Sequence, residues 1–253
     1  MFSDGNAYFM GFAANEVAEI VKRSKQEGIE LIVTASMDLG SSIEAVAIAK
    51  TYDIVHAAVG IHPLEAVIID SNRYNQLRAL AESPEVVALG QIGMHHTNEL
   101  DDAALQVQQR AFIEQLRLAW EVDKPAIICS PGLEKEVMDI LRQTKGVKKI
   151  LHSFRGDEAM FAEAADMGCY FAVGFGLLAP ETTPDKERLA EILKKIPSDR
   201  LILESHMYSR TTLSPRFPWH IKKVAEVIAI LRGTTAEIIG RISTDNLRRI
   251  LQS

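Results

Sequence analysis

Short apolar runs alternate with longer amphipathic stretches along nearly the whole chain. Eight of these runs are rich in Val, Ile, Leu and Ala, and most are continuously apolar rather than alternating with polar residues. They span residues 2–9, 30–36, 54–60, 86–91, 126–130, 148–153, 169–174 and 200–205. Continuous apolar runs are typical of strands buried on both faces, so the pattern predicts a parallel sheet that helices cover.

The amphipathic stretches between these runs predict helices. Two of them carry a capping-box pattern at the start, formed by Ser41 with Glu44 and by Thr234 with Glu237. Each pattern predicts that the two side chains satisfy free amides of the first helical turn. The predicted helices span residues 13–27, 41–52, 102–122, 157–167 and 185–195, and two more lie within 217–251.

Eight strands that alternate with helices predict an α/β fold of the TIM type, a (β/α)8 barrel with parallel strands. The length of 253 residues suits such a barrel, and the chain lacks a glycine-rich phosphate loop. Two helices are expected after the eighth strand, within residues 217–251, so the barrel should carry an extra C-terminal helix. Because no linker or low-complexity tract interrupts the pattern, we expect one domain over residues 1–253. An open, doubly wound sheet of eight strands is the alternative.

Composition narrows the classes of function. The formal net charge is −6 and the isoelectric point is about 5.7, which argues against a surface that coats nucleic acid by charge alone. A nuclease is still compatible with this charge, because a metal ion and a few local arginines can hold a phosphate. The two cysteines, Cys129 and Cys169, lack CxxC spacing and favour a reducing compartment. Without a signal-peptide pattern or an apolar run near the ~20 residues of a membrane span, we expect a cytoplasmic protein with no membrane partner.

Histidines gather at the ends of the predicted strands. In a TIM-type barrel, the carboxyl ends of the strands carry the chemistry. Five of the seven histidines lie at these ends or just beyond them: His62, His95, His96, His152 and His206. Because histidine is the commonest metal ligand and acid–base group, this placement indicates a functional site.

Motifs in several of these stretches resemble, in the same order, those of the TatD-type metal-dependent hydrolases. The matching segments read GIHP (60–63), VVALGQIGMHH (86–96), RAFIEQLRLAWEVDKPAIICS (110–130), LHSFRG (151–156) and RLILESHMYS (200–209). The resemblance covers the whole chain. It implies a TIM-like barrel and the family's activity, which is metal-dependent hydrolysis of phosphodiester bonds in DNA.

At most of the family's metal-ligand positions, this chain carries a different residue. The resemblance places one unchanged ligand here, His152, and substitutions at Asn6, Tyr8, Gln91, Cys129 and His206. Gln91 stands where the family has a bridging glutamate, and a neutral amide cannot bridge two cations as a carboxylate does. We therefore expect that the binuclear mechanism of the family does not operate in this chain.

A mononuclear metal site can be built from what remains. Cys129, His152 and His206 end strands five, six and eight, so they should lie near one another around the mouth of the barrel. One thiolate and two imidazoles with an open fourth position suit a single Zn²⁺ or similar divalent ion. The sequence therefore predicts one metal ion at most, and none if the site is lost.

Other residues near the predicted mouth are candidates for catalysis and substrate binding. His62 and His95 are predicted to act as acid, base or fourth ligand, and His95 rather than His96 should point inward. Glu204 is a carboxylate available to orient or catalyse. After strand six and near the C-terminal helices, Arg155 and Arg216 are predicted to hold a phosphate or carboxylate of the substrate.

Three interpretations stay open at this point. The chain is a diverged hydrolase with a single zinc ion, or a metal-free barrel that binds a small molecule or a protein partner, or an ordinary family hydrolase acting on phosphodiesters. The residues also allow a purely structural interpretation of Cys129 as a small buried hydrophobe. Nucleic acid as the substrate is implied by the resemblance alone.

Overall fold

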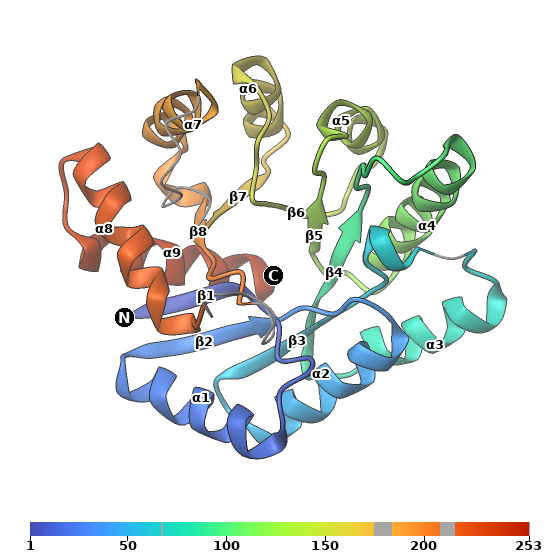
Figure 1. The fold of residues 1–253 in the computed structure, drawn as a ribbon, viewed down its shortest axis with the longest axis horizontal. Coiled ribbons are helices and arrows are strands. Elements are labelled where there is room, and N and C mark those ends of the chain that lie inside the picture. Colours follow the sequence, from blue (N-terminus) through green and yellow to red (C-terminus); the bar gives the residue numbers. More distant parts are fainter. Residues whose placement is uncertain (67, 175–183, 208–215, 253) are drawn as a thin grey trace.

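The predicted strands form one parallel sheet that curves into a nearly closed barrel, with helices around it (Figure 1). The computed structural model describes residues 1–66, 68–174, 184–207 and 216–252. Within this part of the chain, eight strands pair in chain order. A parallel bridge between Ala7 and Met207 joins the first edge of the sheet to the last. The prediction of a TIM-type barrel is confirmed, and the doubly wound alternative is wrong because such a sheet does not pair its strands in chain order.

All eight strands coincide with the apolar runs, although the last four are short. Their bounds are β1 (Phe2–Ala7), β2 (Ile29–Thr34), β3 (Val55–Val59), β4 (Val86–Gly93), β5 (Ala126–Cys129), β6 (Lys149–His152), β7 (Tyr170–Val173) and β8 (Leu201–Leu203).

Helices follow the strands on the outside of the barrel. Their bounds are α1 (Ala14–Gln26), α2 (Leu39–Thr51), α3 (Ser71–Ala81), α4 (Asp102–Glu121), α5 (Glu134–Gln143), α6 (Glu158–Asp166), α7 (Pro184–Lys195), α8 (Ile221–Arg232) and α9 (Ala236–Leu251). Short 3₁₀ helices add η1 (Pro63–Glu65), η3 (Ser198–Arg200) and η4 (Pro218–His220). The pair α8 and α9 after β8 confirms the predicted extra C-terminal helix.

Both predicted capping boxes are wrong in register. Helix α2 begins at Leu39, and its N-cap is Asp38, whose Oδ1 accepts from the Ser41 amide at 2.7 Å. Ser41 is thus the third residue of the helix, since an aspartate three positions earlier is the stronger cap. In α9 the cap is Thr235 rather than Thr234, and its Oγ1 accepts from the Ile238 amide at 3.3 Å.

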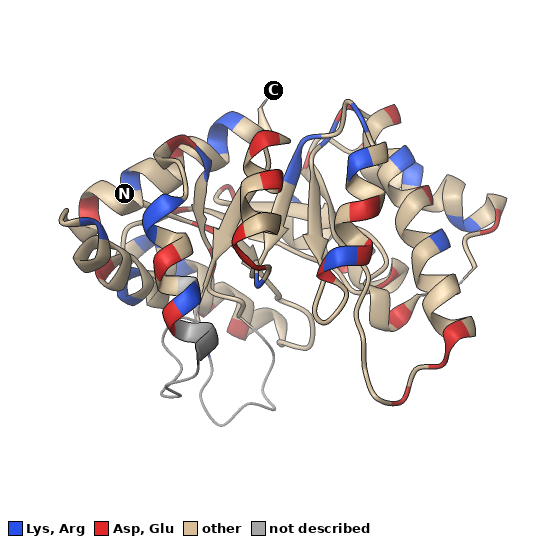
Figure 2. Ribbon diagram, turned by 90° about the horizontal axis from the view of Figure 1, so that it is seen from above, with Lys and Arg blue, Asp and Glu red and all other residues tan. Residues whose placement is uncertain are grey.

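The core continues from the strands onto the C-terminal helix. A cluster of buried strand residues, which includes Ile127, Ile150 and Ile202, packs together with Leu247 and Ile250 of α9. This packing closes the barrel at the end opposite the strand termini that carry the histidines. Basic residues (Lys, Arg) and acidic residues (Asp, Glu) are interspersed along the helices and loops around the barrel (Figure 2). None of the described helices is long and apolar enough to span a membrane.

Candidate functional site

A pocket of about 370 Å³ lies at the carboxyl ends of the strands. Its lining includes six of the eight residues that the sequence predicts for the site: His62, His95, Cys129, His152, Arg155 and His206. The other two, Glu204 and Arg216, are not part of the lining. The candidate ligands fall into two groups, and the sequence-predicted metal set draws members from both.

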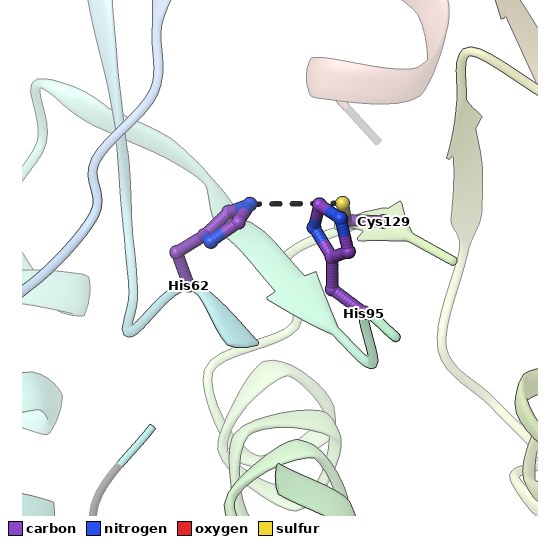
Figure 3. Close-up of side chains that lie close together, drawn as sticks. All are labelled: His62, His95 and Cys129. Carbon is purple, nitrogen blue, oxygen red and sulfur yellow. Dashed lines mark hydrogen bonds between the residues drawn. The ribbon is translucent and has the colours of Figure 1, made fainter. Parts of the chain in front are cut away.

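One group unites the ends of β3, β4 and β5. Nitrogen atoms of His62 and His95 and the sulfur of Cys129 all lie within 4.8 Å of one another, the one such trio found among the described residues. Figure 3 shows both imidazole rings pointing toward the Cys129 sulfur. The ring centroids of His62 and His95 are 6.1 Å apart, and the planes meet at 70°.

His62 is buried at the start of η1, where a backbone amide fixes its tautomer. The Leu64 N–H donates to His62 Nδ1 at 3.2 Å, so the neutral ring carries its proton on Nε2. That Nε2 lies 3.6 Å from Cys129 Sγ. Burial, with a smaller contribution from the neighbouring histidines, lowers the pKa of His62 to about 3. The imidazole is therefore neutral near pH 7.

The side chain of a buried glutamine holds the backbone of His95 in position. Gln108 of α4 accepts from the His95 amide at 2.8 Å and donates to the His95 carbonyl at 3.1 Å. The next residue, His96, is exposed and is not part of the pocket lining. The prediction that His95 rather than His96 points inward is confirmed. Burial also lowers the pKa of His95.

Cys129 ends β5 in close contact with β4. The Met94 amide donates to the Cys129 carbonyl at 3.0 Å, and a Cβ on Gly93 would lie 2.0 Å from that same oxygen. Only glycine fits between the two strands here. Burial raises the pKa of the Cys129 thiol to about 12, so the free thiol is a poor nucleophile and ionises only with a cation beside it.

The second group centres on His152 and Glu204. Glu204 is fully buried, and its Oε2 lies 2.6 Å from His152 Nδ1. Its other oxygen accepts from the Ser153 amide and hydroxyl at 3.1 and 2.7 Å. Burial raises the pKa of Glu204, but its interactions with His152, His206 and Ser153 together outweigh burial, and the pKa is lowered. An ionised carboxylate can only accept, so His152 donates its Nδ1–H and keeps the lone pair on Nε2.

His206 stands beside His152 just after β8. The two rings meet edge to face, with centroids 4.7 Å apart. Burial, followed by the charge of His152, lowers the pKa of His206 to about 4. Arg155 and Arg216 contribute smaller lowering effects, which places both guanidinium groups within electrostatic range of this ring. Arg155 lines the pocket, and Arg216 is exposed.

The predicted trio of Cys129, His152 and His206 draws one member from the first group and two from the second. These three do not form a set within 4.8 Å of one another, although all are described. The trio stays a prediction. Sequence reasoning gave no role to Ser153, which anchors Glu204, or to Asn6, whose Nδ2 lies 3.0 Å from His152 Nδ1. The signal available for Ser153 was its position directly after His152.

Comparisons with known proteins converge on one family. The model of the family described as TatD related DNase matches residues 6–252. The uncharacterized metal-dependent hydrolase YabD of Bacillus subtilis (strain 168) is 30% identical over 243 residues, 94% of this chain and 93% of the relative. The 3'-5' ssDNA/RNA exonuclease TatD of Erwinia tasmaniensis is 25% identical over 248 residues, 94% of each chain.

Structural similarity to a solved protein also supports the barrel fold. The crystal structure of YjjV, a TatD homologue from Escherichia coli K12, matches with a TM-score of 0.84 and 23% identity. The match covers 100% of this chain and 98% of that one. At this level of identity the likeness concerns the barrel, its strand order and the position of the strand ends.

Proposed function

Because this chain belongs to the TatD-related DNase family, we propose that it is a hydrolase that uses one divalent metal ion to cleave phosphodiester bonds of single-stranded nucleic acid. The observation that carries the proposal is the His152–Glu204 pair, which presents an oriented imidazole to a pocket lined by further metal-ligating side chains. The family membership and the name of the Erwinia tasmaniensis relative support the substrate class.

The donor set of the pocket suits one ion better than two. A two-metal centre needs a carboxylate that bridges the cations, and Gln91 at the corresponding position is a buried amide. Asp4 and Glu204 are fully buried and are not part of the lining. Glu134 is the one carboxylate among the described lining residues. Sulfur and imidazole donors dominate, and these favour a single borderline-soft cation such as Zn²⁺.

The residues of this chain supply binding and proton transfer. His152 accepts a proton from water at Nε2, while Glu204 holds the ring through Nδ1 and stabilises the imidazolium that forms. Arg155, on the lining, holds a phosphate oxygen of the substrate. Cys129 and pocket histidines other than His152 would hold the ion, which would supply Lewis acidity toward the scissile phosphodiester.

Exonuclease assays on the purified protein test this proposal. We expect 5'-labelled single-stranded DNA and RNA oligonucleotides to be shortened in the presence of Zn²⁺ or Mn²⁺, and not after treatment with a chelator. Glu204→Gln should lower kcat by about 10²-fold or more, because the imidazole loses the charge that stabilises its protonated form. The matched control Glu226→Gln changes an exposed carboxylate on α8 and should keep full activity.

Two results would contradict the proposal. One is wild-type protein that cleaves neither oligonucleotide with any of these metals. The other is a Glu204→Gln variant as active as the control. Oligonucleotide that binds without being cleaved would instead support the metal-free binding barrel.

A further inference from the structure

We propose that the metal ion is a Zn²⁺ held by His62, His95 and Cys129, at the ends of three consecutive strands. This deepens the proposed function and rests on it for the presence of a catalytic divalent ion. It differs from the sequence-predicted set, which shares only Cys129 with it.

One donor distance in this trio already matches a zinc centre. With Zn–S near 2.3 Å and Zn–N near 2.0 Å, sulfur and nitrogen at two corners of a tetrahedron are about 3.5 Å apart. The distance from His62 Nε2 to Cys129 Sγ is 3.6 Å, and His95 completes a set within 4.8 Å. A small closing movement of His95 would therefore bring the three donors around one ion.

His95 also carries a buried nitrogen that lacks a partner. Its Nδ1 has no hydrogen-bonding partner among the described residues, although the atom is buried. A buried polar atom of this kind is costly unless something else satisfies it. Gln108 is hydrogen-bonded to both the amide and the carbonyl of His95. The His95 imidazole is thereby held beside the Cys129 sulfur (Figure 3).

The other two histidines of the pocket, His152 and His206, interact with Glu204 and with each other. His152 donates to Glu204, and its ring packs against His206 with the centroids 4.7 Å apart. Placing the ion on His62, His95 and Cys129 leaves the lone pair of His152 Nε2 for proton transfer. Each group of the pocket then has one role, the first to bind the ion and the second to move the proton.

Binding has one identifiable consequence for the backbone. His62 can ligate through Nε2 only if its proton moves to Nδ1, and Nδ1 now accepts from the Leu64 amide. That amide must then find another acceptor. Because three protein donors leave a fourth position open, the site has the composition of catalytic rather than structural zinc centres.

Metal binding by the full-length protein tests the inference without an activity assay. We expect the metal-free wild type to take up one Zn²⁺ per chain. We also expect one Co²⁺ per chain with a sulfur-to-cobalt charge-transfer band in the near ultraviolet. Addition of Zn²⁺ should shift the Leu64 amide resonance in a ¹⁵N-labelled sample.

Variants separate the two ligand sets. His95→Ala and Cys129→Ala should lose the stoichiometric zinc, and Cys129→Ala should lose the charge-transfer band. The matched controls His96→Ala, an exposed neighbour, and Cys169→Ala, a buried thiol outside the pocket lining, should keep both. His152→Ala should also keep the zinc. Circular dichroism shows whether each variant folds, and His95→Gln replaces His95→Ala if the smaller side chain prevents folding.

Different outcomes overturn different statements. Zinc retained by His95→Ala but lost by His152→Ala and His206→Ala overturns the inference and leaves the proposed hydrolase intact. A wild type that takes up no zinc or cobalt overturns the inference as well. Zinc bound as described, with no cleavage of any oligonucleotide, overturns the proposed function alone.

Discussion

Glu204 and Asp4 are buried carboxylates next to residues of the pocket, and their surroundings shift their pKa values in opposite directions. Glu204 faces His152, and the pKa of this carboxyl is lowered in spite of its burial. Asp4 faces Ser205 and Asn6, whose three hydrogen bonds to it measure 2.6–3.2 Å. For Asp4 burial outweighs these bonds and raises the pKa to about 7. Glu204 is thus anionic near neutral pH, whereas Asp4 titrates there.

Asp4 therefore links stability to pH. An unfolded aspartate has a pKa of about 3.9, so the folded protein holds the proton between about pH 4 and pH 7. The stabilisation tied to this proton is complete below about pH 4 and is lost as the pH rises through about 7. Asp4→Asn keeps an acceptor for the two backbone amides and cannot titrate. We expect the wild type to lose stability relative to this variant between about pH 5 and pH 8.

Urea unfolding of both proteins across that range measures the effect. His62 and His206 have lowered pKa values and change stability in the opposite direction. They do so equally in both proteins, so the difference between the two proteins reports Asp4 alone. Their contribution rises with pH, since the unfolded state binds the proton that the folded state does not. A constant difference between the two proteins at every pH would contradict the prediction.

At the scale of elements, the contact between the ends of β4 and β5 positions the proposed zinc ligands. Gly93 has a φ of 144°, and its Cα lies against the carbonyl of Cys129. The pairing of Gly93 with Cys129 is the last of the β4–β5 register. His95 follows two residues later, and its imidazole lies near the Cys129 sulfur (Figure 3).

Gly93→Ala should consequently destabilise the protein more than an ordinary substitution of a glycine with positive φ. The new Cβ would lie 2.0 Å from the Cys129 oxygen, so strands β4 and β5 must separate. We expect a loss on the order of 3 kcal/mol or more in the free energy of unfolding. Gly168→Ala is the matched control, since its φ is 72° and nothing lies within 4 Å of its added Cβ. It should cost about 1 kcal/mol.

Chemical denaturation of the two glycine variants checks this expectation. Equal losses would show that backbone conformation alone matters at Gly93. A larger loss for Gly93→Ala would establish the close strand contact as a requirement of the fold.

For the whole molecule, the barrel is what brings distant segments to one pocket. His62 and Cys129 are 67 residues apart in the chain, and His152 and Glu204 are 52 apart. Charge is interspersed around the barrel (Figure 2), and the net charge is −6. The proposed nucleic-acid substrate would therefore be bound by a few groups at the pocket, such as Arg155, and not by the general field of the protein.

A cation that binds only the folded barrel should stabilise the entire molecule. Zinc at about a hundredfold excess over its dissociation constant adds about 2.7 kcal/mol to the free energy of unfolding. For a chain of this size we expect the Tm to rise by roughly 5–10 °C. Calorimetry with and without Zn²⁺ measures the shift, and His95→Ala should show none. A Tm that does not respond to zinc in the wild type would contradict a site that spans three strands.

The sequence alone determined the architecture and the location of the candidate site. Buried parallel strands have continuous apolar runs, so all eight strands could be predicted from local pattern. Because parallel strands end on one face of a barrel, His62, His95, His152, His206 and Cys129 could be assigned to one pocket. Helix α3 was not among the predicted helices, and it buries only Leu77 and Ala81, which leaves little apolar pattern. Helix α5 was also absent from them, although its buried stripe of Val137, Met138, Ile140 and Leu141 could have indicated it.

Only the tertiary structure decided which side chains meet. Local pattern gives each residue a strand end but not the direction of its ring or its hydrogen-bonding partner. The His62 ring is held by the Leu64 amide, and Cys129 is placed by the close contact of β5 with β4. The pairing of Glu204 with His152 depends on Ser153 and on the register of β8 beside β7 and β6. The His62–Cys129 and Glu204–His152 pairings both depend on distances between strands. Packing across the barrel sets those distances, and no single stretch of the chain does.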